Sequence, residues 1–478
     1  MTSTNITRRS FVAAAAALPV LGANASLSPV MAKLSAYMSE AGQAPLPEEA
    51  REKTKQHILD TFAAMVSGSE LVPGKFAINF ARAHSAEKVA TVAASDVVCG
   101  AIEAAFSNAM LAHSDETDDS HAPSESHPGA SIVPSAFAAG EQFNINGARF
   151  LRSVALGYDV GTRVTMTVGV GGFQTATHIS THALAGTFGS AAAAGCAAGL
   201  NARQMRWLID YASQQASGIK TWQRDTDHIE KAFLFAGMPA RNGVTSALLV
   251  QAGATGVDDV LSGQDSFLAD YAPQADPAKL IEKLGERYEI TRTNIKKWTV
   301  GSPIQAPLDA LQAILKKRAF TLDQVKTVTV RVAASEAALV TNREMPDICM
   351  QHMVAVMLVD NTATFKAAHD KARMRDPEIL KQRAKVQLIP DAELERRLPA
   401  RVAIVEVTLA DGSHLTETVT AVRGTAENPM PREEVIAKAR DLLTPVLGAE
   451  RCGKLIQTTM NLETLKSVRE LRPLLQRS

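Results

Sequence analysis

Residues 186–200 read GTFGSAAAAGCAAGL, in which ten of the fifteen residues are alanine or glycine. Side chains this small let helix backbones approach closely, so the run predicts a buried helix packed against its neighbours. The composition of the chain agrees: of 478 residues, 46% are hydrophobic but only 5% are aromatic. Such a composition favours close-packed helices over a β-sandwich.

Helical spacing of apolar residues extends from about residue 27 to residue 270. One helix is expected over residues 48–66, where the pattern ends at Gly68. Further helices are expected at residues 150–167, 204–215 and 241–254. The first half of the chain is therefore predicted to be helical almost throughout.

The pattern changes after Pro273-Gln-Ala-Asp-Pro277. Residues 324–332 (QVKTVTVRV) alternate apolar and polar side chains, which is typical of a half-buried strand. Residues 402–409 and 415–422 predict a β-hairpin around Asp411-Gly412. Helices are expected among these strands, at residues 307–318 and 352–359, so this part is an α+β module.

After Pro429-Met-Pro431 the helical pattern returns, at residues 432–443 and 462–475. This return predicts that the C-terminus rejoins the first domain and that the α+β module is an insertion. The expected fold class is mainly α with an α+β insertion. Residues 26–275 and 426–478 would form the helical domain, and residues 276–425 the smaller α+β domain.

The first residues resemble an export signal. Arg8-Arg9 precedes an apolar run from Phe11 to Leu21, and Ala23-Asn24-Ala25 offers a small-x-small cleavage pattern. The run is too short for a permanent membrane helix. Residues 1–25 are therefore expected to be a twin-arginine signal peptide, with a mature chain from Ser26 located in the periplasm.

The charge balance argues against two classes of partner. Lys+Arg and Asp+Glu number 50 each, so no basic field attracts nucleic acid or an anionic membrane. The cysteines are widely separated, which does not fit an iron–sulfur cluster. Export permits disulfides between them, but the spacing does not require any. They are Cys99, Cys196, Cys349 and Cys452.

Residues 113–127 read HSDETDDSHAPSESH and contain three histidines and five acidic residues. They lie between two apolar segments, residues 104–112 and 130–139. Neighbouring charges and burial push pKa values apart, and such clusters are typical of proton-transfer sites. The alternative is a solvated acidic loop. This cluster predicts an enzyme.

The chain resembles the MmgE/PrpD family in short segments that run in order over nearly the whole mature length. The resemblance is carried by residues 104–113 (AAFSNAMLAH), Asp118-Asp119-Ser120-His121, His127-Pro-Gly, Leu59-Asp60, Gly157-Tyr158, His182 with Gly186–Gly189, residues 237–243 (GMPARNG), residues 296–298, residues 354–360 and residues 427–430. The family includes 2-methylcitrate dehydratase, cis-aconitate decarboxylase and iminodisuccinate epimerase. The resemblance implies a helical domain with an α+β lid, a homodimer, and a site between domain and lid.

The family's chemistry acts on a carbon next to a carboxylate and uses no redox cofactor. We therefore expect a cofactor-independent lyase for a small di- or tricarboxylic acid. Dehydration of a 2-methylcitrate-like 2-hydroxy acid, the reaction of a hydro-lyase, is favoured over decarboxylation or epimerisation. Such a reaction needs a positioned base and cations that hold the substrate carboxylates. No bound metal is expected.

Residue types in the resembling segments supply both kinds of group. Candidate acid–base groups are Glu116, Asp119, His127 and His182. Candidate substrate-binding groups are Ser120, Lys231, Lys296, Lys297 and His352. Asp119 with Ser120 either orients His127 or caps the following helix. The sequence does not decide which lysine of the 296–297 pair faces a pocket.

The chain departs from the family pattern at several positions. Phe235 stands where many members have histidine, Gly301 and Gln305 where relatives often place histidine or cysteine, and His352 where a tyrosine is expected. These replacements leave open an exported carboxylate-binding protein without catalysis. A metal-dependent hydrolase that uses His113, His121 and His127 is a further alternative.

Overall fold

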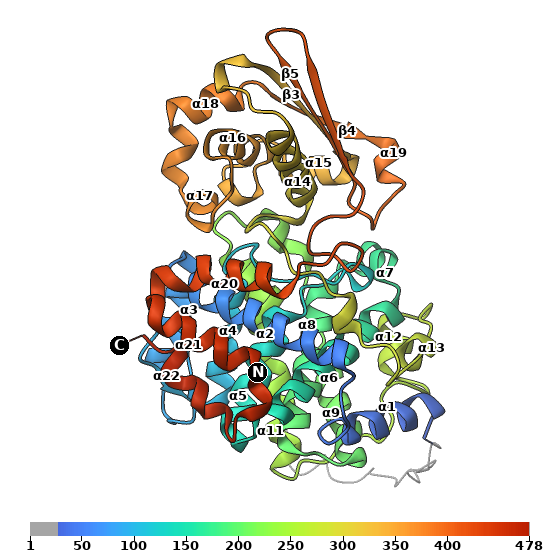
Figure 1. Ribbon diagram of the computed structural model, residues 1–478. Coiled ribbons are helices and arrows are strands. Elements are labelled where there is room, and N and C mark those ends of the chain that lie inside the picture. The colour runs from blue at the N-terminus through green and yellow to red at the C-terminus, as the bar shows by residue number, and fades with distance from the viewer. Residues whose placement is uncertain (1–26, 478) are drawn as a thin grey trace, which may run out of the picture.

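A computed structural model of the chain describes residues 27–477 (Figure 1). The predicted signal peptide, residues 1–25, lies outside the described residues. The helices before the sheet are α1 Pro29–Glu40, α2 Glu48–Gly68, α3 Val72–Ala83, α4 Ala101–Ala112, α5 Gly129–Phe143, α6 Gly147–Val168, α7 Val170–Thr177, α8 Thr181–Ala198, α9 Ala202–Gln214, α10 Ile229–Ala232, α11 Met238–Gln251, α12 Phe267–Tyr271 and α13 Ala278–Ile281.

An α/β part follows, and further helices close the chain. The α/β part contains α14 Ser302–Lys317, β3 Val325–Ala333, α15 Ala334–Val340, α16 Met350–Asp360, α17 Phe365–His369, α18 Pro377–Arg383, β4 Val386–Asp391, α19 Ala392–Glu395, β5 Ala403–Leu409 and β6 His414–Val419. The last helices are α20 Arg432–Leu447, α21 Ala449–Met460 and α22 Arg472–Leu475. The prediction of a mainly α protein with a small α+β region is confirmed. Among the described residues, no helix has both the length and the apolar character needed to cross a membrane.

The Ala/Gly-rich run forms α8, which is buried along nearly its whole length. Helix α6 crosses it so closely that a Cβ on Gly161 would lie 2.2 Å from the carbonyl oxygen of Ala185. A Cβ on Gly189 would lie 2.8 Å from the carbonyl oxygen of Gly157. Glycine is required at these crossings because any side chain would push the backbones apart. The predicted close packing of residues 186–200 is confirmed.

Two large clusters of buried apolar residues organise the described chain. The larger joins residues 31–295 with residues 430–475, so that the red C-terminal helices lie beside the blue α2 in Figure 1. The smaller extends from Trp298 to Val422 and includes the sheet. Leu280, Ile290 and Ile295 belong to the larger cluster, although the sequence assigned residues 276–297 to the α+β domain.

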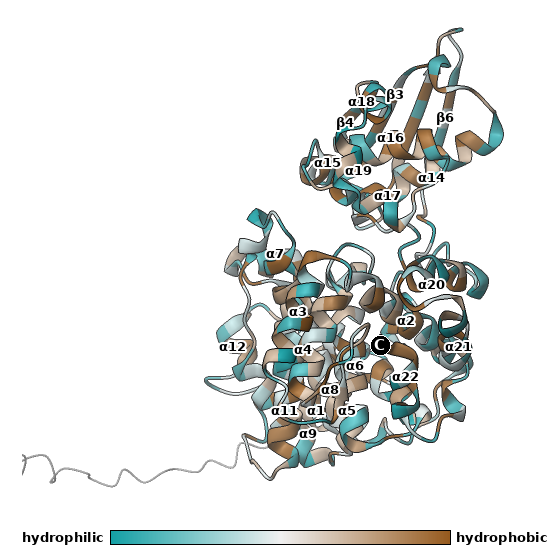
Figure 2. Cartoon of the chain, turned by 90° about the vertical axis from the view of Figure 1, so that its left-hand side faces the viewer, coloured by the Kyte–Doolittle hydropathy of each residue, from teal (hydrophilic) through white to brown (hydrophobic). Residues whose placement is uncertain are grey.

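The main sheet has four strands in the order β4-β3-β5-β6. Strand β3 pairs in parallel with β4 and antiparallel with β5, and the predicted hairpin is formed by β5 and β6. Alternate residues of β5 are buried, as the sequence pattern indicates. Hydrophobic colour follows β3 in Figure 2, where α14 and α16 lie beside the sheet. The sequence analysis missed β4.

The C-terminal segment differs from its prediction. Residues 462–475 do not form one helix but two 3-10 turns, Leu462–Thr464 and Val468–Leu471, followed by α22. A capping box at Ser467 and Glu470 starts a new turn there, because it satisfies the backbone N–H groups of a fresh helix end. Helix α21 was also not predicted.

Candidate active site

The acidic segment folds inward between α4 and α5, and most of its charged side chains are buried. The Nδ1 atom of His113 at the end of α4 lies 2.8 Å from Asp118 Oδ2. The other oxygen of Asp118 faces His127, whose Nδ1 lies 3.3 Å away. Asp118 is fully buried, whereas the side chain of His127 is 11% exposed. One carboxylate therefore holds two imidazole rings, and His127 is the one that water reaches.

An aromatic ring packs against these histidines. Phe235 stacks on His182 with ring centroids 3.8 Å apart, and on His113 at 4.8 Å. Phe235 belongs to a π-helical turn, Phe233–Gly237, just before α11. Pro239 lacks the N–H that would bond to the Phe235 carbonyl in an α-helix, which favours this irregular turn. The site thus has one apolar wall.

Two lysines face the site from distant segments. Lys231 of α10 makes an ion pair with Glu116 Oε1 and lies 5.2 Å from the ring centroid of Phe235. Lys296 donates to the carbonyl oxygen of Glu116 at 2.9 Å, and its Nζ lies 3.5 Å from Glu116 Oε2 and 3.7 Å from Asp118 Oδ1. The Lys296 side chain is 2% exposed and that of Lys231 is 17% exposed. Glu116 therefore lies between two ammonium groups.

Burial and charge act in opposite directions on these groups. Burial alone would raise the pKa of the Glu116 carboxyl, but Lys231 and Lys296 hold that pKa well below its usual value. Burial lowers the pKa of His127, although Asp118 opposes the shift, and it lowers the pKa of His182 well below its usual value. Both imidazoles are therefore neutral at pH 7, and two lysine side chains lie beside them.

Asp119 contacts neither His127 nor a lysine. Its carboxylate accepts a hydrogen bond from the backbone N–H of Gly129 at 2.9 Å and one from the Tyr158 hydroxyl at 2.5 Å. His57 Nδ1 lies 2.8 Å from it. A Cβ on Gly129 would lie 2.7 Å from Asp119 Oδ2, so the His-Pro-Gly motif leaves room for this carboxylate. Of the two roles considered for Asp119, the geometry fits the cap of α5.

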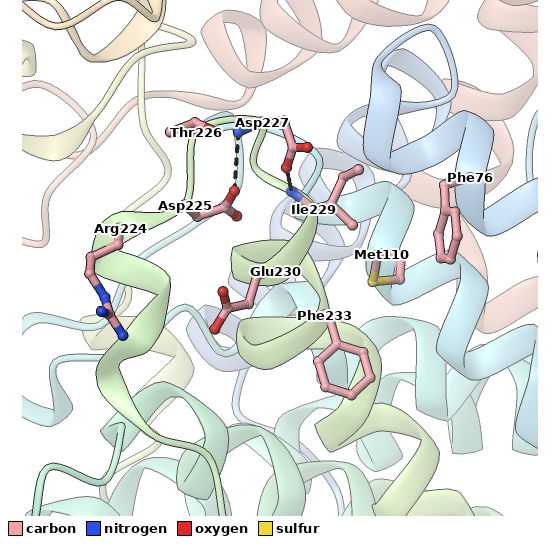
Figure 3. Close-up of a pocket in the computed structure, with 9 residues that line it drawn as sticks. All are labelled: Phe76, Met110, Arg224, Asp225, Thr226, Asp227, Ile229, Glu230 and Phe233. Carbon is pink, nitrogen blue, oxygen red and sulfur yellow. Dashed lines mark hydrogen bonds between the residues drawn. The ribbon is translucent and has the colours of Figure 1, made fainter.

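A separate cavity of about 540 Å³ lies beside the segment that carries Lys231 (Figure 3). It is lined by Phe76, Met110, Arg224, Asp225, Thr226, Asp227, Ile229, Glu230 and Phe233. Asp225 and Asp227 accept backbone hydrogen bonds within their own turn, as Figure 3 shows. None of the predicted site residues lines this cavity.

Comparison with known proteins assigns the chain to a family. The MmgE/PrpD N-terminal domain matches residues 32–279, and the MmgE/PrpD C-terminal domain matches residues 298–463. The chain belongs to the MmgE/PrpD family. The cis-aconitate decarboxylase of Aspergillus terreus (strain NIH 2624 / FGSC A1156) is 23% identical over 94% of this chain and 96% of its own length. Human cis-aconitate decarboxylase is 23% identical over 90% of this chain and 91% of its own length.

The structure of this family member brings together five of the predicted site residues: His127, His182, Glu116, Lys231 and Lys296. Ring centroids of His127 and His182 are 5.2 Å apart, and Glu116 connects Lys231 with Lys296. Ser120 lies at the edge, where its backbone pairs with that of Asn294. Its side chain makes no hydrogen bond among the described residues.

Two predicted site residues point elsewhere. Lys297 donates to Gln312 Oε1 at 2.6 Å and lies 4.3 Å from the ring centroid of Trp298. Adjacent side chains of an extended segment point in opposite directions, so Lys296 enters the site and Lys297 does not. His352 is fully buried in the core of the α/β part. No hydrogen bond or ring contact joins His352 to the other histidines within residues 27–477.

The family departure at Gln305 has a structural explanation. Its side-chain amide donates to the carbonyl oxygens of Trp298 and Val300, at 2.7 and 2.9 Å. Its carbonyl oxygen accepts from the backbone N–H of Trp298. Gln305 therefore fixes the backbone after Lys296, and both N–H donors of its side chain are already used.

Several residues of the site were not predicted as such. Asp118 and His113 were quoted in the family motifs, and His113 also as a metal ligand of the alternative hypothesis, but neither was assigned to the acid–base or substrate-binding groups. His228, whose ring centroid lies 5.3 Å from that of His113, was not assigned a role. Lys438 of α20 donates to the carbonyl oxygen of Thr117 at 2.9 Å and lies 2.6 Å from Asp60. Asp60 was quoted in the family motif, which was the one sequence signal for this contact.

The geometry also bears on the metal-dependent alternative. Atoms of His113, Asp118 and His127 lie within 4.8 Å of one another. However, the Lys296 ammonium group lies 3.7 Å from Asp118. The charge of this carboxylate is therefore already partly balanced by a lysine of the protein. His121 faces away from the other two histidines, toward Ser124 at 2.8 Å and Glu289 at 3.4 Å. The three histidines of that hypothesis therefore do not converge.

Proposed function

We propose that this protein is a lyase that acts on a small di- or tricarboxylic acid without a redox cofactor. The observation that carries the proposal is the pairing of two cations with two neutral imidazoles at one buried site. Lys231 and Lys296 are suited to hold carboxylates, and His127 and His182 are suited to exchange a proton with the carbon between them. We take decarboxylation of a cis-aconitate-like acid as the first reaction to test.

Substrate binding would change the protonation of the site. Lys231 and Lys296 already form ion pairs with Glu116. A bound di- or tricarboxylate therefore adds negative charge that the two lysines do not fully balance. Negative charge close to an imidazole favours its protonated form. His127 would therefore take up a proton when the substrate binds and become the proton donor that the reaction needs.

Decarboxylation fits the apolar wall of the site. When the bond to the carboxylate carbon breaks, CO₂ leaves uncharged and the electron pair remains on the substrate carbon framework. The buried Phe235 ring makes the surroundings of His182 and His113 less polar, and such surroundings favour a neutral product over a charged one. The carbanion then takes one proton, from His127 in this proposal, and the remaining carboxylates stay on the lysines.

The relatives named above support decarboxylation over the dehydration that the sequence analysis favoured. Dehydration of a 2-hydroxy acid remains the second candidate. A neutral His127 next to Asp118 is a competent base for removing a proton beside a carboxylate. The loss of hydroxide would need a separate proton donor, and we propose His182, whose ring centroid lies 5.2 Å from that of His127.

The two reactions are distinguished by their products. Residues 26–478 would be incubated with cis-aconitate and, separately, with 2-methylcitrate, while CO₂ release and the proton NMR spectrum are recorded. Release of CO₂ with a dicarboxylate product supports decarboxylation. Collapse of the methyl doublet of 2-methylcitrate to a singlet without CO₂ release, because the proton on the methyl-bearing carbon is lost, supports dehydration. Tight binding of both acids without any product would support the binding-protein alternative.

Two further expectations concern the cellular form of the protein. We propose export to the periplasm through the twin-arginine route, supported by Arg8-Arg9 and the apolar run after it. We also propose a homodimer, supported by apolar side chains exposed on α3, namely Val72, Phe76 and Phe80 at 60%, 49% and 38%. Sedimentation velocity at micromolar concentration tests the homodimer, and a monomer would contradict it.

A further inference from the structure

Helix α17 connects the two buried clusters. Ala367 and Ala368 belong to the smaller cluster, whereas Phe365 packs against the larger one. The backbone N–H of Phe365 donates to Asp441 Oδ2 of α20 at 3.4 Å. At the other end of α17, His369 Nε2 lies 2.8 Å from Asp115 Oδ2. This short helix therefore attaches the α/β part to the segment that forms the site.

Asp115 organises the turn that carries Glu116. Its carboxylate accepts from the backbone N–H of Thr117 at 2.9 Å and from the Thr117 hydroxyl at 2.5 Å. The two Thr117 donors and the imidazole of His369, which forms an ion pair with this carboxylate, come from two different parts of the fold. Since Glu116 lies between Asp115 and Thr117, the direction of its side chain depends on this turn.

We propose that His369 is a positioning residue, which through Asp115 holds Glu116 between Lys231 and Lys296. His369 itself does not touch these lysines. The inference rests on the proposed function only in treating the two lysines as the carboxylate-binding groups. A buried Asp115 without a cationic partner would be strained electrostatically, and the turn would then open toward water.

The surroundings of His369 favour its charged form. The ring Nδ1 donates to the carbonyl oxygen of Phe365 at 2.7 Å, which leaves Nε2–H to face Asp115. Asp347, in the 3-10 turn Pro346–Ile348, is the second carboxylate near this ring. Burial would lower the pKa of His369, but Asp115 and Asp347 raise it to about 9. The contact is therefore charged at neutral pH.

The experiment compares backbone amide exchange in three variants with the wild type. In His369→Gln, deuterium uptake at residues 115–118 is expected to quicken at least about tenfold, because the turn opens more often. Uptake in β3 and α16 is expected to stay unchanged. In His369→Lys, whose ammonium group can still reach Asp115, slow uptake at residues 115–118 is expected to return. A role in packing alone would not be rescued by lysine.

The matched control is His414→Gln. His414 forms an exposed pair with Glu406 at 3.3 Å in the same α/β part, and its loss is expected to leave residues 115–118 unaffected. Unchanged exchange in His369→Gln, or equal effects of His369→Gln and His414→Gln, would overturn the proposal. The measurement needs no substrate, so it decides the placement of Glu116 even if the wild type turns over none of the acids tested. With an active wild type, His369→Gln is expected to raise KM more than it lowers kcat.

Discussion

Replacing Lys296 by methionine removes the more deeply buried of the two cations. Its Nζ lies 3.5 Å from Glu116 Oε2 and 3.7 Å from Asp118 Oδ1. At an effective dielectric constant of about 20, each contact is worth roughly 5 kcal/mol of attraction. Desolvation of the buried charges offsets much of this, and breaking such a contact typically costs about 3 kcal/mol in the free energy of unfolding.

The same change is expected to weaken catalysis. A lost charge-assisted contact to a substrate carboxylate lowers kcat/KM by about 100-fold, which corresponds to about 2.7 kcal/mol. Two assays check these numbers: urea unfolding followed by circular dichroism, and steady-state turnover of cis-aconitate. Methionine keeps most of the side-chain volume, so a packing defect contributes little.

Lys297 supplies the control within the same segment. Its Nζ bonds to Gln312 and lies over the Trp298 ring, outside the site. Lys297→Met is therefore expected to leave kcat/KM within about twofold of the wild type and to cost less than about 1 kcal/mol. Equal loss of kcat/KM in both variants, or full activity in Lys296→Met, would refute the placement of Lys296.

Three other outcomes are expected. Binding of tricarballylate, a saturated tricarboxylate, is expected to cause proton uptake by His127 near pH 7, which calorimetry detects as a binding heat that depends on the buffer. The absence of proton uptake would argue against protonation of His127. The free energy of unfolding falls by up to about 3 kcal/mol between about pH 6.5 and 9, because His369 in the folded protein keeps its proton up to a pKa of about 9. Urea unfolding of His369→Gln is expected to show a weaker pH dependence. An equally steep pH dependence in the variant would contradict this prediction. A reporter fused to residues 1–30 reaches the periplasm, and replacing Arg8 and Arg9 with lysine stops it; unchanged export would exclude the twin-arginine route.

Local periodicity explains why most helices could be predicted. The apolar spacing over residues 48–66 and the small side chains of residues 186–200 depend only on neighbours in sequence. Strand β4 was missed because its parallel partner β3 is distant in the sequence, so no local turn signal marks the pairing. The break at Ser467 overrides an apolar pattern that continues through residue 475.

The cluster of titratable residues was recognised from the sequence, but the contact partners of its side chains were not. Asp118 and Asp119 are adjacent and chemically identical, yet the turn directs one to His127 and the other to Gly129. Lys296 and Lys297 diverge in the same way. Such directions depend on tertiary contacts, including the backbone pairing of Ser120 with Asn294. His352 lies in α16, and the apolar residues around that helix bury the His352 side chain in the core of the α/β part.

The role of His127 as proton donor is tested most directly by turnover of cis-aconitate in deuterated water. The wild type is expected to release CO₂ and to place one deuterium on the carbon that receives the proton, as read by NMR. His127→Ala is expected to slow this at least about 100-fold, while His178→Ala, which changes an exposed histidine at the end of α7, leaves it unchanged. Full turnover with His127→Ala would contradict the account.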